Sequence, residues 1–172
     1  MPHALFPTHF GTCGIAWGEN GLTCFQLPDD TEALTGRSLA ARGGTQRGEP
    51  PEWVRLIIAR VQMHLEGKLQ DFSGTALDRS CASDFQMAVY LQAQAIKPGF
   101  EKSYGEIARL MALGSEAARA VGMALAANPW PLIVPCHRVV SAEGRMTGFS
   151  APGGIRTKAR LLALEGAELL SD

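Results

Sequence analysis

The segment LIVPCHRVVS, residues 132–141, places a thiol, an imidazole and a guanidinium side by side between two apolar runs. A cysteine acts as a nucleophile only as its thiolate, so its ordinary pKa of about 8.5 must be lowered by a nearby base or cation. His137 and Arg138 are the neighbours that could lower the pKa of Cys136. The segment therefore predicts nucleophilic chemistry at Cys136.

A buried free cysteine that packs as a small apolar side chain is the alternative interpretation of Cys136. We expect that state for Cys13 and Cys24, which also lie in apolar runs. For Cys136 it leaves His137 and Arg138 without a role in apolar surroundings. Consecutive side chains of a β-strand point to opposite faces, so the thiol and the imidazole can interact only if the chain turns or a water molecule bridges them.

The composition excludes several classes of protein. The 172 residues are 46% hydrophobic with a formal net charge of −1, which suffices for a core and excludes a grossly basic nucleic-acid binder. The four cysteines form no CxxC pair, so we expect free thiols, no metal site and no cofactor. The sequence has neither a signal-peptide pattern nor about 18 consecutive apolar residues, which predicts a cytoplasmic protein without a membrane contact.

Residues 1–82 are predicted to form a small α/β domain. The apolar runs GTCGIAW and LTCFQL flank Gly-Glu-Asn-Gly at 18–21, and Asn-Gly between such runs is typical of a β-hairpin. Residues 36–51 mix glycine, arginine and proline and are expected to form a surface loop, with one helical turn near Leu39 and the strongest tendency to disorder. Apolar residues at helical spacing in 52–66 predict a helix that covers the sheet.

Residues 83–172 are predicted to form a mostly helical domain packed on the first, which gives an α+β fold. Three serines are expected to be N-caps, Ser83 for a helix over 84–96, Ser103 for one over 104–112 and Ser115 for one over 116–127. The last two helices are short and are joined by a glycine-containing turn, which is typical of a helix-turn-helix. Ordinary helical domains also contain such pairs, so the pattern alone does not assign a function.

The second helix of this pair has an outer face with few charges. Ala118, Val121 and Leu125 share a face that can pack inward, while the opposite face carries small residues, Met123 and one cation, Arg119. Small residues admit sugar-phosphate walls and an arginine can enter a groove, so this face suits nucleic acid. A second buried face explains the same pattern equally well.

Five sequence segments carry a resemblance to a known family. They are FQMAVY (85–90), SYGEIA (103–108), AARAVGMALAANP (117–129), PCHRVV (135–140) and LLALEG (161–166). In order and spacing they resemble the O6-alkylguanine-DNA alkyltransferases, over residues 84–166. The resemblance implies a DNA-repair methyltransferase that moves the alkyl group of O6-alkylguanine in double-stranded DNA irreversibly to its own cysteine. It also implies base flipping by a minor-groove helix-turn-helix, no cofactor and a monomer.

The resemblance implies a role for each matching residue. Cys136 resembles the alkyl acceptor, His137 the base that acts on the thiol through a water molecule, and Glu165 the carboxylate that orients the histidine. Asn128 resembles the asparagine that holds the active-site turn together. Tyr104 resembles the tyrosine that helps to rotate the nucleotide out and protonates the departing guanine.

The resemblance also implies a DNA-contacting surface and a base pocket. Arg119 resembles the arginine finger that fills the gap left in the duplex by the flipped base. The expected DNA-contacting residues are Ser103, Ala117, Ala118, Arg119, Ala120, Gly122 and Met123. Val134, Phe149 and Ser150 are expected to line the base pocket.

The chain departs from the family pattern near this pocket. Glu101 stands where the family has threonine, Phe149 where it has tyrosine, and Ala151 and Pro152 lengthen the loop. The range of alkyl groups, the acceptance of O4-alkylthymine and the role of Arg138 therefore stay open.

Two other functions remain to be weighed against alkyl transfer. A non-catalytic DNA binder is disfavoured by Cys136, because family members that flip the base without transfer lack this cysteine. A cysteine hydrolase using Cys136, His137 and Glu165 lacks a sequence signature for an oxyanion hole and leaves the helix pair unexplained.

Overall fold

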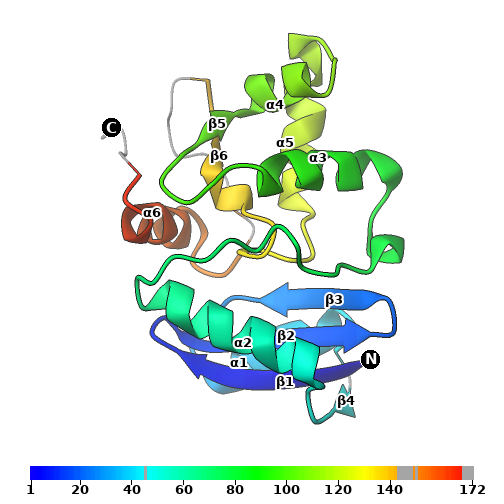
Figure 1. The fold of residues 1–172 in the computed structure, drawn as a ribbon, viewed down its shortest axis with the longest axis vertical. Coiled ribbons are helices and arrows are strands. Elements are labelled where there is room, and N and C mark those ends of the chain that lie inside the picture. The colour runs from blue at the N-terminus through cyan, green and yellow to red at the C-terminus, as the bar shows by residue number, and fades with distance from the viewer. Residues whose placement is uncertain (45, 143–148, 150, 168–172) are drawn as a thin grey trace.

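The chain folds into an N-terminal sheet with two helices and a mostly helical C-terminal part, stacked along the long axis of the molecule (Figure 1). The computed structural model describes residues 1–44, 46–142, 149 and 151–167. This arrangement confirms the predicted α+β fold class. The boundary between residues 82 and 83 stays a prediction.

The N-terminal sheet has the strand order β3-β2-β1-β4. Its strands are β1 (Pro2–Thr8), β2 (Gly11–Gly18), β3 (Gly21–Gln26) and β4 (Gln46–Arg47). The antiparallel pairing of β2 with β3 confirms the predicted hairpin. Strand β1 was not among the predicted elements, and its Pro2 and Pro7 count against a strand.

Helices cover both faces of this sheet (Figure 1). Helix α2 (Glu52–Leu65) confirms the predicted helix over the sheet, with Val54 and Val61 buried. Helix α1 (Glu32–Ala41) lies on the opposite face, where Leu39 packs against β2 and β3. The prediction of a loop with one helical turn over 36–51 is therefore wrong for residues 36–41, which belong to α1. Burial of Leu39 outweighs the low helix propensity of the glycine in this helix.

The C-terminal part contains four helices among the described residues. They are α3 (Asp84–Gln94), α4 (Tyr104–Leu110), α5 (Ala118–Ala126) and α6 (Gly154–Leu164), with 3₁₀ turns at Arg79–Cys81, Ser115–Ala117 and Cys136–Arg138. A short parallel pair of strands, β5 (Lys102–Ser103) and β6 (Val139–Val140), connects the start of α4 to the segment after Cys136.

Two of the three predicted serine caps are correct. Ser83 and Gln86 form a reciprocal capping box at the start of α3. The Ser103 hydroxyl accepts a hydrogen bond from the Glu106 N–H at the start of α4. Ser115 is not a cap, because it begins a 3₁₀ turn that leads into α5, and α5 starts without a side-chain cap.

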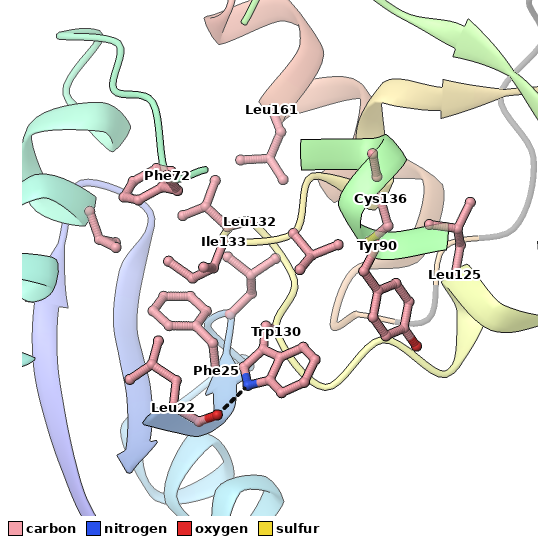
Figure 2. Packing of buried hydrophobic residues seen from close by; sticks show 14 of the residues in the cluster. Leu22, Phe25, Phe72, Tyr90, Leu125, Trp130, Leu132, Ile133, Cys136 and Leu161 are labelled. Atoms are coloured by element: carbon pink, nitrogen blue, oxygen red, sulfur yellow. Dashed lines mark hydrogen bonds between the residues drawn. The ribbon is translucent and has the colours of Figure 1, made fainter. Parts of the chain in front are cut away.

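One apolar core runs through both parts of the molecule (Figure 2). The Trp130 side chain is fully buried, and its indole N–H donates to the Leu22 carbonyl of β3 at 2.8 Å. Its ring meets Tyr90 of α3 edge to face, with centroids 6.0 Å apart. The Phe25 N–H donates to the Pro129 carbonyl at 2.9 Å. Strand β3 thus anchors the segment that leads from α5 to Cys136.

In the ranges that the structure describes, no helix is long and apolar enough to cross a membrane.

Candidate active site

The segment that carries Cys136 is a single 3₁₀ turn rather than an extended strand. The Arg138 N–H donates to the Pro135 carbonyl at 2.9 Å, and the Cys136 N–H donates to the Val134 carbonyl at 2.8 Å. All three side chains of the turn are buried, with His137 fully inaccessible and Cys136 8% exposed. The sequence left two ways for the thiol and the imidazole to interact, a turn of the chain or a bridging water molecule. The structure shows that the chain turns.

Asn128 fixes the segment that precedes this turn. Its side-chain N–H₂ donates to the Val134 carbonyl at 3.0 Å, and its oxygen accepts from the Trp130 N–H at 2.9 Å. Both bonds are buried, so each satisfies a backbone group that water does not reach. Asn128 therefore closes the loop between α5 and Cys136, in the place that the sequence prediction requires.

Glu165, at the C-terminal end of α6, is the centre of a buried polar network. Its two oxygens accept from Nε and Nη2 of Arg138, both at 2.8 Å. Nε2 of His137 lies 3.0 Å from each oxygen, and Nε2 of His64 lies 2.8 Å from Oε2. Burial acts to raise the pKa of Glu165, but hydrogen bonds from Arg138, His137 and His64 outweigh it and hold this pKa well below its usual range.

This network answers the question of Arg138 that the sequence left open. Arg138 forms a two-pronged ion pair with Glu165, and its Nη1 donates to the Ile96 carbonyl at 2.6 Å. The guanidinium therefore neutralises the buried carboxylate and ties the Cys136 turn to the end of α3.

The partners of the two histidines determine their tautomers. An ionised carboxylate only accepts hydrogen bonds, so Nε2 carries the proton in both His64 and His137. The Gln70 N–H donates to Nδ1 of His64 at 2.9 Å, as this tautomer requires. Nδ1 of His137 is buried and has no hydrogen-bond partner among the described residues. Neutral His137 thus presents a free lone pair, which a general base needs.

The thiol and the imidazole are both neutral at rest. Burial raises the pKa of Cys136, against the opposing effects of a hydrogen bond from Asn128 and of the Lys158 charge. Burial lowers the pKa of His137, although its contact with Glu165 acts in the other direction. Arg138, one of the two neighbours that could lower the pKa of the thiol, is instead paired with Glu165.

Lys158 and His64 are site residues that sequence reasoning missed. The Lys158 side chain is 1% exposed, and its ammonium donates to the Val139 carbonyl at 2.8 Å. A spacing of seven residues puts Lys158 and Glu165 near the same face of α6, a signal that was available in the sequence. His64 lies 101 residues from Glu165, and no local pattern connects the two.

Tyr104 begins α4 and is half-buried against the start of the helix pair. The Lys158 ammonium lies 6.0 Å from the centre of its ring. A Cβ added at Gly122 would lie 3.8 Å from the same ring, so the tyrosine ring faces α5 at its glycine. Tyr104 therefore lies between the buried ammonium of α6 and the outer face of α5.

The outer face of α5 is open rather than buried. Arg119, Ala120 and Met123 are exposed, and Met123 reaches 67%. Ser103, Ala117, Ala118 and Gly122, which were also predicted to contact DNA, are half-buried. Inward packing is correct for Val121 and Leu125 but only partial for Ala118. A second buried face of α5 is therefore excluded.

The residues predicted to line the base pocket are only partly described. Val134 is fully buried, Phe149 is half-buried, and Ser150 lies outside the described residues. Ala151 and Pro152 of the longer loop line a cavity of about 470 Å³ beside Asn128. Gln26, Asp29, Ser38 and Arg42 of the N-terminal part line its other wall. The described residues that line this cavity do not include Cys136.

The described residues contain no group of histidine, cysteine, aspartate and glutamate side chains suited to hold a metal ion.

Comparison with known proteins extends the resemblance to the whole chain. Residues 84–167 match the family model "6-O-methylguanine DNA methyltransferase, DNA binding domain". A methylated-DNA–protein-cysteine methyltransferase of Methanosarcina acetivorans is 35% identical over 173 residues, covering 97% of this chain and 99% of the relative. The crystal structure of a Mycobacterium tuberculosis O6-methylguanine methyltransferase has a TM-score of 0.75 and 32% identity, covering 99% of this chain and 95% of that one. A Mycobacterium tuberculosis protein named OGT, crystallised with DNA, has the same TM-score and identity over 96% of this chain and 93% of its own.

Proposed function

The chain belongs to the methylated-DNA–protein-cysteine methyltransferase family, and from this membership we propose a role for each residue of the site. It is a DNA-repair methyltransferase that transfers the methyl group of O6-methylguanine to one of its own cysteines. We propose Cys136 as that cysteine. The observation that carries this choice is the buried, unpartnered Nδ1 of His137, next in sequence to the thiol and oriented through Nε2 by Glu165.

The other three thiols lack such a base. Burial raises the pKa of Cys13 to about 12. Burial likewise raises the pKa of Cys24, which lies in the core between the sheet and α1. Cys81 is exposed, and partial burial followed by the Asp78 charge raises its pKa as well. Among the described residues, Cys136 is the one cysteine that combines a neighbouring histidine with a stabilised carboxylate.

The proposed reaction begins with a proton transfer. Through one bridging water, the Cys136 thiol gives its proton to Nδ1 of His137, and the imidazolium is stabilised by Glu165. The thiolate attacks the alkyl carbon, a carbon–sulfur bond forms, the carbon–O6 bond breaks, and its electron pair goes to the guanine. Tyr104 donates a proton to the departing base, which lowers the cost of the developing negative charge. The thioether has no good leaving group, so one molecule repairs one lesion.

The buried position of Cys136 requires that the damaged nucleotide leave the helix. Flipping costs a few kcal/mol of stacking and pairing, and less for a mispaired lesion. The open face of α5 would lie in the minor groove, and Arg119 would fill the vacated position. We propose that the protein acts in this way on double-stranded DNA, as a monomer in the cytoplasm and without a cofactor.

The direct test is the intact mass of the protein after incubation with a duplex that contains one O6-methylguanine. We expect a gain of one methyl group, mapped to Cys136 by peptide analysis, and an unmethylated guanine in the DNA. Cys136→Ala should show no gain. Unmodified wild-type protein with the lesion still present, or a methyl group on another cysteine, would refute the assignment.

Replacing Arg119 with alanine should slow transfer from duplex DNA by roughly 10- to 100-fold, because the flipped state loses the side chain that fills the gap. Transfer from the free base O6-methylguanine, which needs no flipping, should be unchanged. The measurement is the single-turnover rate constant on each substrate. Arg55→Ala, which removes an exposed arginine from α2, is the matched control and should affect neither substrate. Equal losses on both substrates would exclude the proposed role of Arg119.

A further inference from the structure

His64 brings the N-terminal part of the molecule into contact with the proposed catalytic machinery. It lies in the last turn of α2, and both its side chain and that of Glu165 are fully buried. The other donors to Glu165, His137 and Arg138, belong to the Cys136 turn itself. Among the described residues, the Glu165 carboxylate thus accepts hydrogen bonds from two elements. One is the Cys136 turn and the other is α2, the helix that covers the sheet.

The imidazole of His64 is fixed at both nitrogens. Nδ1 accepts from the Gln70 N–H at 2.9 Å, and Nε2 donates to Oε2 of Glu165 at 2.8 Å. The ring also packs against Phe72, with centroids 5.4 Å apart. Because the ring is held in this way, its Nε2–H bond points in one fixed direction. It therefore constrains where the Glu165 carboxylate can lie.

The bonds from the Cys136 turn position Glu165 only within the C-terminal part. Arg138 connects the carboxylate to the turn and to the Ile96 carbonyl after α3. His137 is 3.0 Å from both oxygens, so a rotation of the carboxylate would carry the imidazole with it. The His64 bond is the one that opposes such a rotation from outside the turn.

We propose that His64 is a positioning residue for alkyl transfer, which makes α2 of the N-terminal part a component of the acceptor site. It holds the Glu165 carboxylate, and through it the ring of His137, in the orientation that aims Nδ1 toward the thiol proton. A misplacement of about 1 Å in a catalytic group can cost about 100-fold in rate, so a single support of this kind matters. The proposal rests on the proposed function of Cys136, His137 and Glu165.

Two substitutions of His64 separate positioning from packing. In His64→Gln, the amide N–H₂ can occupy the place of Nε2 and still donate to Glu165. In His64→Asn, the shorter side chain can accept from the Gln70 N–H but does not reach Glu165. Both remove the ring from the core, so their losses of stability should be similar, and only one keeps the bond that the proposal requires.

The experiment measures single-turnover methyl transfer to Cys136 over a range of duplex concentrations, together with thermal unfolding of each variant. We expect His64→Asn to lower the rate constant at saturating DNA by about 10-fold or more, the effect of losing one hydrogen bond to a charged group. The DNA concentration for half-maximal rate should not change. His64→Gln should stay within about 3-fold of wild type. Val61→Ala, a core truncation one turn earlier in α2, should lower stability without lowering the rate constant.

Equal rate constants for His64→Asn and His64→Gln would overturn the proposal, as would a loss in proportion to stability that Val61→Ala shares. If the asparagine variant does not fold, His64→Phe takes its place, since it fills the ring volume without a donor and should lose the same rate. A wild-type protein that acquires no methyl group would refute the proposed function instead. The wild-type reaction thus distinguishes the two failures.

Discussion

Replacing Glu165 with glutamine is expected to lower the rate of methyl transfer to Cys136 by roughly 10²- to 10⁴-fold, the range for loss of general acid–base catalysis. Each oxygen of Glu165 accepts a hydrogen bond from Arg138, so the amide N–H₂ meets a donor in either orientation. The amide would have to turn away, and His137 would lose the acceptor that keeps its proton on Nε2. With the proton on Nδ1, the imidazole cannot accept one from the thiol.

The rate constant for single-turnover transfer from duplex DNA, at saturating DNA, measures this effect. Glu52→Gln makes the same chemical change at the exposed start of α2 and should leave the rate constant unchanged. Circular dichroism of both variants checks that the protein is folded at the temperature of the assay. A folded Glu165→Gln protein that transfers at the wild-type rate would show that His137 acts without the carboxylate.

The sequence predicted the elements whose local signals are strong. The Asn-Gly turn gave the β2–β3 hairpin, and apolar residues at helical spacing gave α2. Ser83 and Ser103 have side chains that cap a helix in the structure, as their positions suggested. In each case the chemistry that determines the structure lies within a few residues, so the sequence is enough to find it.

Elements that depend on tertiary packing were missed or misplaced. Helix α1 contains Gly36, which counts against a helix, yet it forms because Leu39 is fully buried against the sheet. Strand β1 carries two prolines and still pairs with β2 from His3 to Thr8. Local propensity predicts the wrong state at such positions because burial contributes more free energy than propensity does.

The site shows the same division. The proximity of Cys136 and His137 could be read from the sequence, and the resemblance placed Glu165 with them. The contribution of His64 could not be read from the sequence, because it depends on how α2 packs against α6. The two residues that meet there are 101 positions apart in the chain. Arg138 was identified but its partner was not, because an arginine beside a cysteine first suggests an effect on the thiol.

The charges of the resting site explain how it can hold a reactive thiol. At rest the thiol and the His137 imidazole are uncharged, and Glu165 is balanced by Arg138. The proposed proton transfer from Cys136 to His137 would create a thiolate and an imidazolium, so the net charge of the site would not change. The apolar surroundings that raise the pKa of the thiol also keep water from competing at the alkyl carbon.

Replacing Arg138 with methionine is expected to lower the free energy of unfolding by about 3–5 kcal/mol near pH 7, because it leaves the Glu165 carboxylate buried with only neutral donors. The sign of the pH dependence follows from the lowered pKa of Glu165. A carboxyl group of this kind stabilises the fold above its unfolded pKa of about 4.3, and the stabilisation is lost as the pH falls. Arg138 is the first of the hydrogen-bonding partners that lower this pKa. The difference between wild type and variant should therefore shrink below about pH 4.

Urea unfolding of Arg138→Met and wild type, at about pH 7 and again at about pH 3, measures this difference. Arg109→Met removes an exposed arginine of α4 and should change stability by less than about 0.5 kcal/mol at either pH. A difference for Arg138→Met that is as large at low pH as at neutral pH would mean that lost packing, not the unpaired carboxylate, causes the destabilisation. A difference that vanishes as Glu165 takes up its proton would identify the ion pair as the group that holds the Cys136 turn in place.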